Sequence, residues 1–167
     1  MAAQSKTIVY VDTMIIFEAT QCRCFAMILN HFDVHTVDVV AQEATAGDPR
    51  RDDYIEVDKK LLAKTTVHPT NPGMIARATV KSPLMTQIHK GERALLAYIW
   101  EAKPTGFYLT SCDHAAVRAA CALGFDRYLK SLEEIARAAG ASPKVKDWYT
   151  SRWLSIAITK YHMDYVR

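Results

Sequence analysis

The chain has 167 residues, of which 50% are hydrophobic and 23% are charged. This length is enough for one domain with a sizeable core and too short for two ordinary domains. The net charge of +3 permits a nucleic-acid partner without requiring one, because strong electrostatic binders usually cluster their Lys and Arg residues.

The cysteine pattern and the apolar segments indicate the cellular location of the protein. The four cysteines form no CxxC pair and no zinc-ligand pattern, and Cys22 and Cys24 are too close to bridge comfortably. They are expected to be reduced, mostly buried thiols of a cytosolic protein. No stretch reaches membrane-spanning length, and the N-terminus lacks a signal-peptide pattern. We therefore expect a soluble, cytoplasmic protein without a membrane partner.

The first elements alternate between strand and helix. A β-branched run that ends in an acid predicts a buried strand at residues 7–12. Residues 17–32 have the apolar spacing of one continuous helix, which would include the first two cysteines. A second short strand is expected within residues 33–40, leading into a helix at residues 41–46 that the following Gly and Pro end.

The middle of the chain begins with its most charged stretch. Residues 48–60 indicate an exposed loop or strand, and a solvated surface is the favoured interpretation. A third strand is expected at residues 65–70, and Pro72 suits the first turn of a helix. A longer helix is then predicted at residues 85–102.

The last part of the chain continues the alternation. A buried strand is predicted at residues 107–109 and a helix at residues 115–123, with Gly124 ending it. Residues 126–140 predict a short strand and another helix, and Pro143 begins a final helical segment.

Strands that alternate with helices predict parallel strands joined by crossover helices. We therefore expect an α/β fold: a three-layer α/β/α domain with a mainly parallel central sheet. This domain would span residues 1–140, and residues 141–167 would form an extra C-terminal helix.

Four acids are expected near the carboxyl edge of this sheet, where functional residues of parallel sheets gather: Asp12, Glu43, Glu92 and Asp113. Each has an ordinary explanation, as a turn, a helix-surface charge or, for Asp113, a helix N-cap. Carboxylates that converge on one edge repel each other, so they persist mainly when divalent cations lie between them. Oxygen ligands of this kind suit Mg²⁺ or Mn²⁺.

The segments that carry these acids read VYVDTMII, VVAQEA, KGERALLAYIW and YLTSCDHAAVRAACALGF. In this order and spacing, the chain resembles the PIN domain, a family of small metal-dependent nucleases that includes the toxins of prokaryotic toxin–antitoxin pairs. The resemblance covers about residues 8–138. Two features depart from it: Met14 stands where members often have Asn, and the tail from Ser142 is longer than in the usual toxin.

The resemblance implies a Mg²⁺- or Mn²⁺-dependent endoribonuclease. Asp12 and Asp113 would be the principal catalytic metal ligands, Glu43 and Glu92 would complete the site, and Ser111 would orient a ligand or water. The bound cation would activate water and neutralise charge on the phosphate.

Substrate contacts are expected from cations near the acids: Lys90, Arg93, His114 and Arg118. Each is about as well explained as an ordinary surface charge. The resemblance implies RNA as the substrate, although the sequence shows no aromatic platform for stacking RNA bases.

The tail has aromatic residues at helical spacing between Tyr149 and Tyr165. Packing on its own domain is the favoured interpretation, and a surface for a second subunit or an antitoxin-like protein is the alternative. The resemblance implies a homodimer. Two functions remain open: a ribonuclease, for which the toxin of a toxin–antitoxin pair is one candidate, and a catalytically lapsed PIN-fold RNA-binding or scaffold protein. The presence of all four acids favours the ribonuclease.

Overall fold

The computed structural model describes residues 5–165. Residues 1–4, at the start of the expected domain, and residues 166–167, at the end of the expected C-terminal helix, lie outside that range. Four strands form one sheet in the order β3-β2-β1-β4, and every strand pairing in it is parallel. The strands are β1 (Ile8–Val11), β2 (Asp33–Val37), β3 (Thr66–His68) and β4 (Phe107–Thr110). The prediction of a mainly parallel sheet is confirmed.

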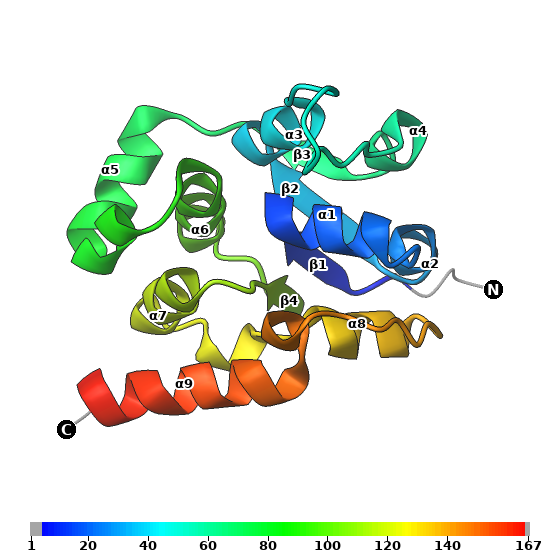
Figure 1. Ribbon diagram of the computed structural model, residues 1–167. Helices are drawn as coiled ribbons and strands as arrows, with labels where there is room; N and C mark the ends of the chain where they lie inside the picture. The colour runs from blue at the N-terminus through cyan, green and yellow to red at the C-terminus, as the bar shows by residue number, and fades with distance from the viewer. Residues whose placement is uncertain (1–4, 166–167) are drawn as a thin grey trace.

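Helices cover both faces of the sheet (Figure 1). One face carries α1 (Thr13–Gln21), α2 (Phe25–His31) and α8 (Leu132–Ala138). The other carries α6 (Lys90–Ala102) and α7 (His114–Ala122), and α5 (Pro72–Lys81) packs on the outer side of α6. Two further helices, α3 (Asp38–Thr45) and α4 (Lys59–Leu62), lie between β2 and β3 in the chain. The three-layer α/β/α expectation is therefore confirmed.

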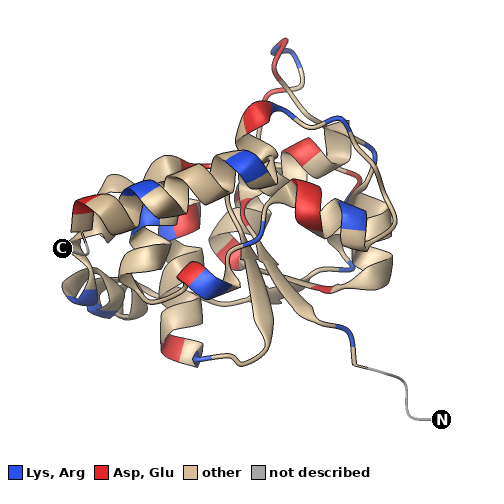
Figure 2. Ribbon diagram, turned by 90° about the horizontal axis from the view of Figure 1, so that it is seen from below, with Lys and Arg blue, Asp and Glu red and all other residues tan. Residues whose placement is uncertain are grey.

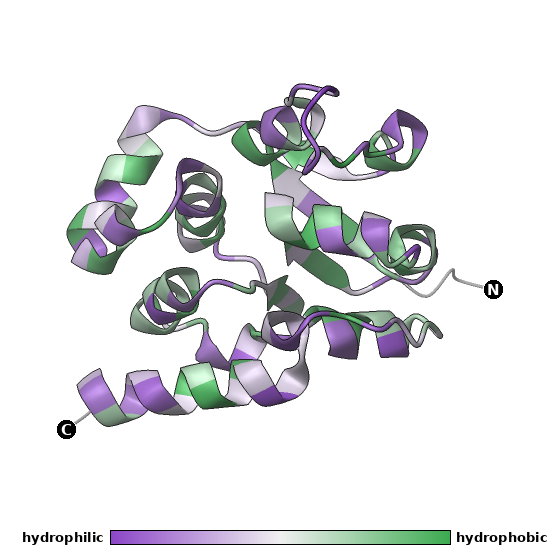
Figure 3. Cartoon of the chain, viewed as in Figure 1, coloured by the Kyte–Doolittle hydropathy of each residue, from purple (hydrophilic) through white to green (hydrophobic). Residues whose placement is uncertain are grey.

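The core lies between the layers, where the central strand β1 and its neighbours bury apolar side chains on both faces of the sheet. Val9 and Val34 pair across β1 and β2 and are both buried, as are Leu109 of β4 and Ile16 of α1. The hydropathy colouring of Figure 3 shows the apolar strands inside and a hydrophilic loop beside α3 and α4. That loop follows α3 and contains no strand, in agreement with the solvated surface favoured for this charged segment.

The single helix expected at residues 17–32 is wrong, because the chain forms two helices with a turn between α1 and α2. Arg23 has a left-handed backbone (φ 57°), and the N–H of Cys24 donates to the carbonyl of Ala19 (3.0 Å). The apolar spacing continues across this turn, so the pattern alone did not reveal it. Cys22 and Cys24 are free thiols at the turn and do not lie within a helix.

Two other boundaries differ from the prediction. The helix expected at residues 85–102 is a 3₁₀ turn, η1 (Pro83–Gln87), followed by α6, which begins after His89. The strand expected after Asp126 is the 3₁₀ turn η2 (Asp126–Tyr128) with one parallel bridge between Leu129 and Leu109. A local 3₁₀ turn thus replaces the first part of the expected helix in one place and the expected strand in the other.

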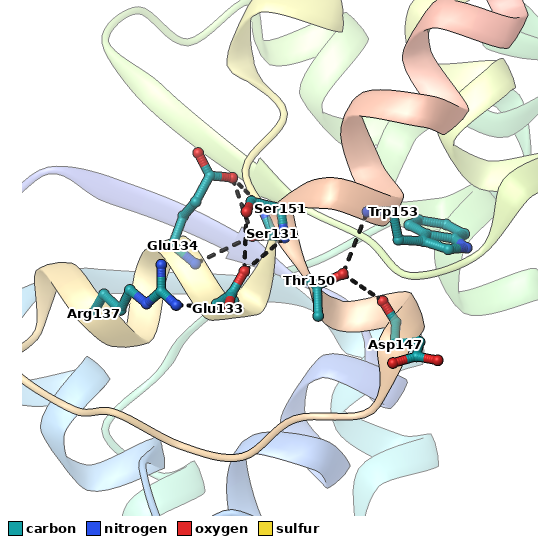
Figure 4. Close-up of polar contacts among 8 residues, drawn as sticks. All are labelled: Ser131, Glu133, Glu134, Arg137, Asp147, Thr150, Ser151 and Trp153. Carbon is teal, nitrogen blue, oxygen red and sulfur yellow. Dashed lines mark hydrogen bonds and ion pairs between the residues drawn. The ribbon is translucent and has the colours of Figure 1, made fainter.

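The C-terminal segment folds back onto the domain. It comprises the 3₁₀ turn η3 (Asp147–Tyr149) and α9 (Ser151–Tyr165), which packs against α7 and α8. At the start of α9, the N–H and hydroxyl of Ser151 both donate to Glu133 Oε2 of α8, at 2.9 and 3.0 Å (Figure 4). Leu154 and Ala157 are buried in the contact. The favoured interpretation, a tail that packs on its own domain, is confirmed.

The division of the chain into a domain at residues 1–140 and a C-terminal helical extension at residues 141–167 stays a prediction. Among residues 5–165, no helix is long and apolar enough to cross a membrane.

Candidate active site

Two of the predicted acids follow neighbouring strands in the chain and lie at the same edge of the sheet. Val11 of β1 pairs with Thr110 of β4, and Asp12 and Asp113 follow these strands directly or within three residues. Each begins a helix: Asp12 Oδ1 accepts the N–H of Ile15, and Asp113 Oδ1 accepts the N–H of Ala116, both at 2.9 Å. The N-cap interpretation of Asp113 is therefore confirmed for one carboxylate oxygen. Capping occupies one oxygen of each acid, so both acids keep a second oxygen for another partner.

The other two acids come from helices that pack against each other at this edge. Glu92 lies in the first turn of α6, where its Oε2 accepts the N–H of His89 at 3.3 Å. Glu43 lies on α3, and its Oε2 accepts the hydroxyl of Thr13 at 2.7 Å. Residue 91 is Gly, and a Cβ there would lie 2.4 Å from Glu43 Oε2. The glycine therefore leaves room for the carboxylate of Glu43 against the first turn of α6.

Asp12 is almost completely removed from water, with 2% of its surface exposed. Burial, and then the charge of Asp113, raise the pKa of Asp12 to about 7, although hydrogen bonds from the backbone oppose this shift. Its Oδ2 atom is buried and has no hydrogen-bond partner. A buried carboxylate oxygen without a donor is costly unless the group is neutralised or a cation binds it.

Burial and neighbouring negative charges also disfavour the ionised form of Glu92. It is 8% exposed, and burial raises its pKa to about 8. The charges of Asp12, Asp113 and Glu43 each raise it further. Because all three other acids act on this one carboxyl group, the structure brings the four predicted acids into one electrostatic cluster.

A cleft of about 350 Å³ opens beside this cluster. Three of the acids line it, and the other residues around it are Thr13, Met14, Phe17, Ala46 and His89. Met14, which stands where the resemblance expects Asn, therefore adds an apolar wall to the cleft. The cleft is large enough for a small polar group to approach the acids from solvent.

Ser111 lies close to both capping acids, and its role in orienting a ligand or water stays a prediction. It is buried, and its hydroxyl accepts the N–H of Asp113 at 3.5 Å. It also lies close enough to Asp12 to lower the pKa of that carboxyl against the effect of burial. The adjacent Cys112 is part of the same environment, because burial and the charge of Asp12 raise its thiol pKa well above the usual range.

The C-terminal segment also reaches this edge of the sheet. Tyr149 is buried, and its hydroxyl donates to the carbonyl of Met14 at 3.4 Å. The N–H of Lys146 donates to the buried carboxylate of Glu18 on α1 (3.2 Å), and the Lys146 ammonium lies 3.3 Å from it. The tail thus contacts α1, the helix that follows Asp12, through Met14 and Glu18.

The donor atoms suit a hard divalent cation. Within residues 5–165, no three His, Cys, Asp or Glu side chains are arranged so that they could hold a metal ion together. His89 and Thr13 each hold one oxygen of Glu92 and Glu43, respectively. The partnerless Asp12 Oδ2 and the all-oxygen donor set are of the type that Mg²⁺ or Mn²⁺ prefers.

Of the predicted substrate-binding cations, Lys90 is the one that contacts an acid of the cluster. Its ammonium lies 3.9 Å from Glu43 Oε1 and is mostly exposed. Arg93 instead donates to three backbone carbonyls of the turn before α6, those of Met85, Thr86 and Ile88. These bonds give Arg93 a structural role in orienting the start of α6.

The other two cations contact the C-terminal helix. The His114 ring lies 4.5 Å from the ring of Trp153, centroid to centroid. The guanidinium of Arg118 lies 5.0 Å from the ring centroid of Tyr165 and donates to its hydroxyl. In Figure 2 the Lys and Arg positions alternate with Asp and Glu positions along the ribbon. A substrate role for Arg93, His114 and Arg118 stays a prediction.

Sequence reasoning missed two residues that shape this site, Thr13 and Gly91. Thr13 follows Asp12 directly, and its hydroxyl fixes Glu43. Gly91 lies inside a helical pattern, where a glycine is unfavourable unless something approaches the backbone closely. That cost was the available signal for Gly91, and the nearby Glu43 explains it.

No model of a known protein family matches the chain, and a search of curated proteins also finds no match.

Proposed function

We propose that the protein is a metal-dependent endoribonuclease that hydrolyses RNA phosphodiester bonds with Mg²⁺ or Mn²⁺. The observation that carries the proposal is the buried, partnerless Asp12 Oδ2, which lies among like charges at the carboxyl edge of a parallel sheet and beside an open cleft. Such an arrangement is costly without a cation and useful with one, because the same cation can bind a phosphate oxygen.

The roles follow from the positions of the side chains. Asp12 and Asp113 would hold the cation with their second oxygens, and Glu43 and Glu92 would complete its surroundings. The bound cation would lower the pKa of a water molecule and neutralise charge on the phosphate. Thr13 holds the carboxylate of Glu43 in place.

Two carboxyl groups of the site hold protons in the cation-free protein. The raised pKa values of Asp12 and Glu92 keep these groups partly protonated near neutral pH. Binding of a divalent cation therefore releases protons.

The resemblance to PIN-domain nucleases supports the same function and extends it. It adds a homodimer, an antitoxin-like partner protein and a cytoplasmic location as proposals. A PIN-fold protein that binds RNA without cleaving it is the second candidate, and the intact set of four acids argues against it.

Cleavage of a labelled single-stranded RNA tests the proposal directly. The parent protein should cleave in Mn²⁺ or Mg²⁺ and not in EDTA. Asp113→Asn keeps an N-cap but loses a ligand charge, so cleavage should fall by more than about a hundredfold. Its stabilisation by Mn²⁺ should also fall, whereas the parent gains roughly 2.7 kcal/mol at a hundredfold excess over the dissociation constant.

Asp58→Asn is the matched control. Asp58 also caps a helix, accepting the N–H of Lys60 at 2.8 Å, but it lies on α4 away from the four acids. It should leave cleavage and the Mn²⁺ response unchanged. An Asp113→Asn protein that cleaves and melts like the parent would return Asp113 to the role of a helix cap. A parent that binds RNA but does not cleave it would favour the second candidate.

A further inference from the structure

A second hollow continues from the acidic cleft. Its volume is about 180 Å³, and it shares Phe17 and Ala46 with the cleft, so the two form one groove. The remaining residues around it belong to the charged segment that follows α3: Gly47, Asp48, Arg51, Asp53, Tyr54 and Ile55. The segment expected to be only a solvated surface therefore forms one end of the groove beside the acids.

Two aromatic rings from different elements line this hollow. Phe17 comes from α1 and Tyr54 from the charged segment, 37 positions later. Tyr54 is held against the backbone of Gly47, where φ is +142° and an added Cβ would lie 3.0 Å from the tyrosine ring. The glycine thus leaves room for one edge of the Tyr54 ring, its Cδ2 and Cε2 atoms, beside the chain.

The rim of the hollow carries paired polar groups. The guanidinium of Arg51 makes two hydrogen bonds to the carboxylate of Asp53, at 2.9 and 2.8 Å. The chain also turns tightly here, because the N–H of Tyr54 donates to the carbonyl of Arg51 (3.1 Å). Donors and acceptors therefore stand together beside two aromatic faces, a combination that suits a flat heteroaromatic ring with polar edges.

We propose that this hollow is a subsite for one unstacked nucleobase of a single-stranded RNA. The base stacks on Tyr54 and Phe17, and its edge meets Arg51 and Asp53, while the adjoining phosphate lies at the acids. The inference deepens the proposed ribonuclease function and rests on it.

Binding measurements test the subsite separately from catalysis. The probe is a fluorescently labelled single-stranded RNA, and its affinity is measured by anisotropy in EDTA, where cleavage is absent. Tyr54→Leu keeps apolar bulk and removes the aromatic face, and it should weaken binding about tenfold, the usual loss for one base–aromatic stack. Tyr54→Phe should bind like the parent. Thermal melting of both variants checks that they fold.

Neighbouring arginines supply a matched control. Arg51 lines the hollow with a side chain that is 69% exposed, whereas Arg50, whose side chain is 89% exposed and pairs with Asp48, does not line it. Arg51→Ala should weaken RNA binding several-fold, and Arg50→Ala should leave it nearly unchanged. Equal losses in the two variants would indicate general electrostatics and would overturn the subsite.

An RNA with an abasic position completes the test. Abasic substitution at successive positions should weaken binding to the parent at one position and should not weaken binding to Tyr54→Leu any further there. Equal effects on the two proteins at every position would overturn the subsite, as would a parent that binds no single-stranded RNA. A parent that binds RNA through Tyr54 but does not cleave it with Mn²⁺ would overturn the nuclease and keep the subsite.

Discussion

Two clusters of ionisable side chains lie on the same sheet and differ in how their charges are matched. In the acidic cluster, Asp12 and Glu92 are buried among like charges, and Asp12 Oδ2 has no partner. In the second cluster, His35 joins two neighbours through its two ring nitrogens. Nδ1 lies 2.9 Å from His68 Nε2, and Nε2 lies 3.0 Å from Asp33 Oδ2.

The rings of this second cluster, the histidine cluster, contact one another. Tyr98 of α6 stacks on His68 with 4.3 Å between ring centroids, and Tyr10 of β1 packs edge-on against His35. Burial, together with the charges of Tyr98 and Asp33, raises the pKa of Tyr10 to about 12, so its hydroxyl stays neutral. Both ring nitrogens of His35 thus have a polar neighbour, as is usual for a structural polar cluster.

The difference teaches how to separate function from structure here. A cluster that holds the fold together pairs donors with acceptors, whereas the acidic cluster leaves a buried oxygen free and puts carboxylates together. Stability is lost in such an arrangement, and proteins keep it where a ligand restores the balance. Three measurements test whether the two clusters differ in this way.

The largest expected effect is a pH dependence of stability in EDTA. The pKa of Asp12 rises from 3.8 to about 7 and that of Glu92 from 4.5 to about 8 on folding. The folded state therefore binds more protons than the unfolded state between about pH 4 and pH 8. The free energy of unfolding should fall as pH rises through this window, and thermal melting from pH 4.5 to 8.5 measures it.

Two controls identify the source of that slope. Asp12→Asn removes one titrating group and one like charge, so the slope should become shallower and the variant should be at least as stable as the parent at pH 8. Saturating Mn²⁺ should reverse the loss at high pH, because it binds the deprotonated carboxylates. A parent whose stability in EDTA is flat or rises across this window would show that the acids are not under electrostatic stress.

A smaller effect is expected from Gly91→Ala. The new Cβ would meet the carboxylate of Glu43, which is the flexible end of its side chain and can turn away. The stability cost should therefore stay near the loss of one hydrogen bond to Thr13, about 1 kcal/mol. The Mn²⁺ response and cleavage should fall by more than this small cost suggests, because a ligand of the cation has moved.

Gly73→Ala, in the first turn of α5, is the control for adding a methyl group to a helical glycine. Its Cβ would meet the end of the Arg77 side chain at 3.2 Å, which lies away from the acids. It should be neutral or slightly stabilising, as expected for Ala in place of Gly in a helix, and should leave the Mn²⁺ response unchanged. A Gly91→Ala protein with a normal Mn²⁺ response would remove Glu43 from the proposed site.

The sequence predicted the part of the site that depends on local patterns. Asp12 and Asp113 could be placed because each follows a buried strand, and neighbouring parallel strands end at one edge. The approach of Glu43 to Glu92 depends on how α3 packs against α6, which no local pattern encodes. Gly91 leaves room for the Glu43 carboxylate beside α6, and this role can be recognised only when the position of α3 is known.

The fold was predictable to a similar depth. Strand positions and the parallel sheet followed from apolar runs and their alternation with helices. The break at Arg23 did not, because one left-handed residue ends a helix without changing the apolar spacing on either side. The pairing of Phe17 with Tyr54 around one hollow is likewise a product of tertiary structure, since the two lie far apart in the chain.

The smallest expected effect has the opposite sign and comes from the histidine cluster. Burial and the neighbouring His35 lower the pKa of His68 below 6.5. The unfolded state therefore binds more protons at this position, and its stability contribution is lost as pH falls through that lowered pKa. His68→Phe keeps a ring to stack on Tyr98 and removes the titration. In an Asp12→Asn background with EDTA, the variant should lose a few tenths of a kcal/mol less than its parent between pH 7 and pH 5. Parallel melting curves for the two proteins across this range would show that the histidine cluster does not titrate, and that the two clusters differ less than their geometry indicates.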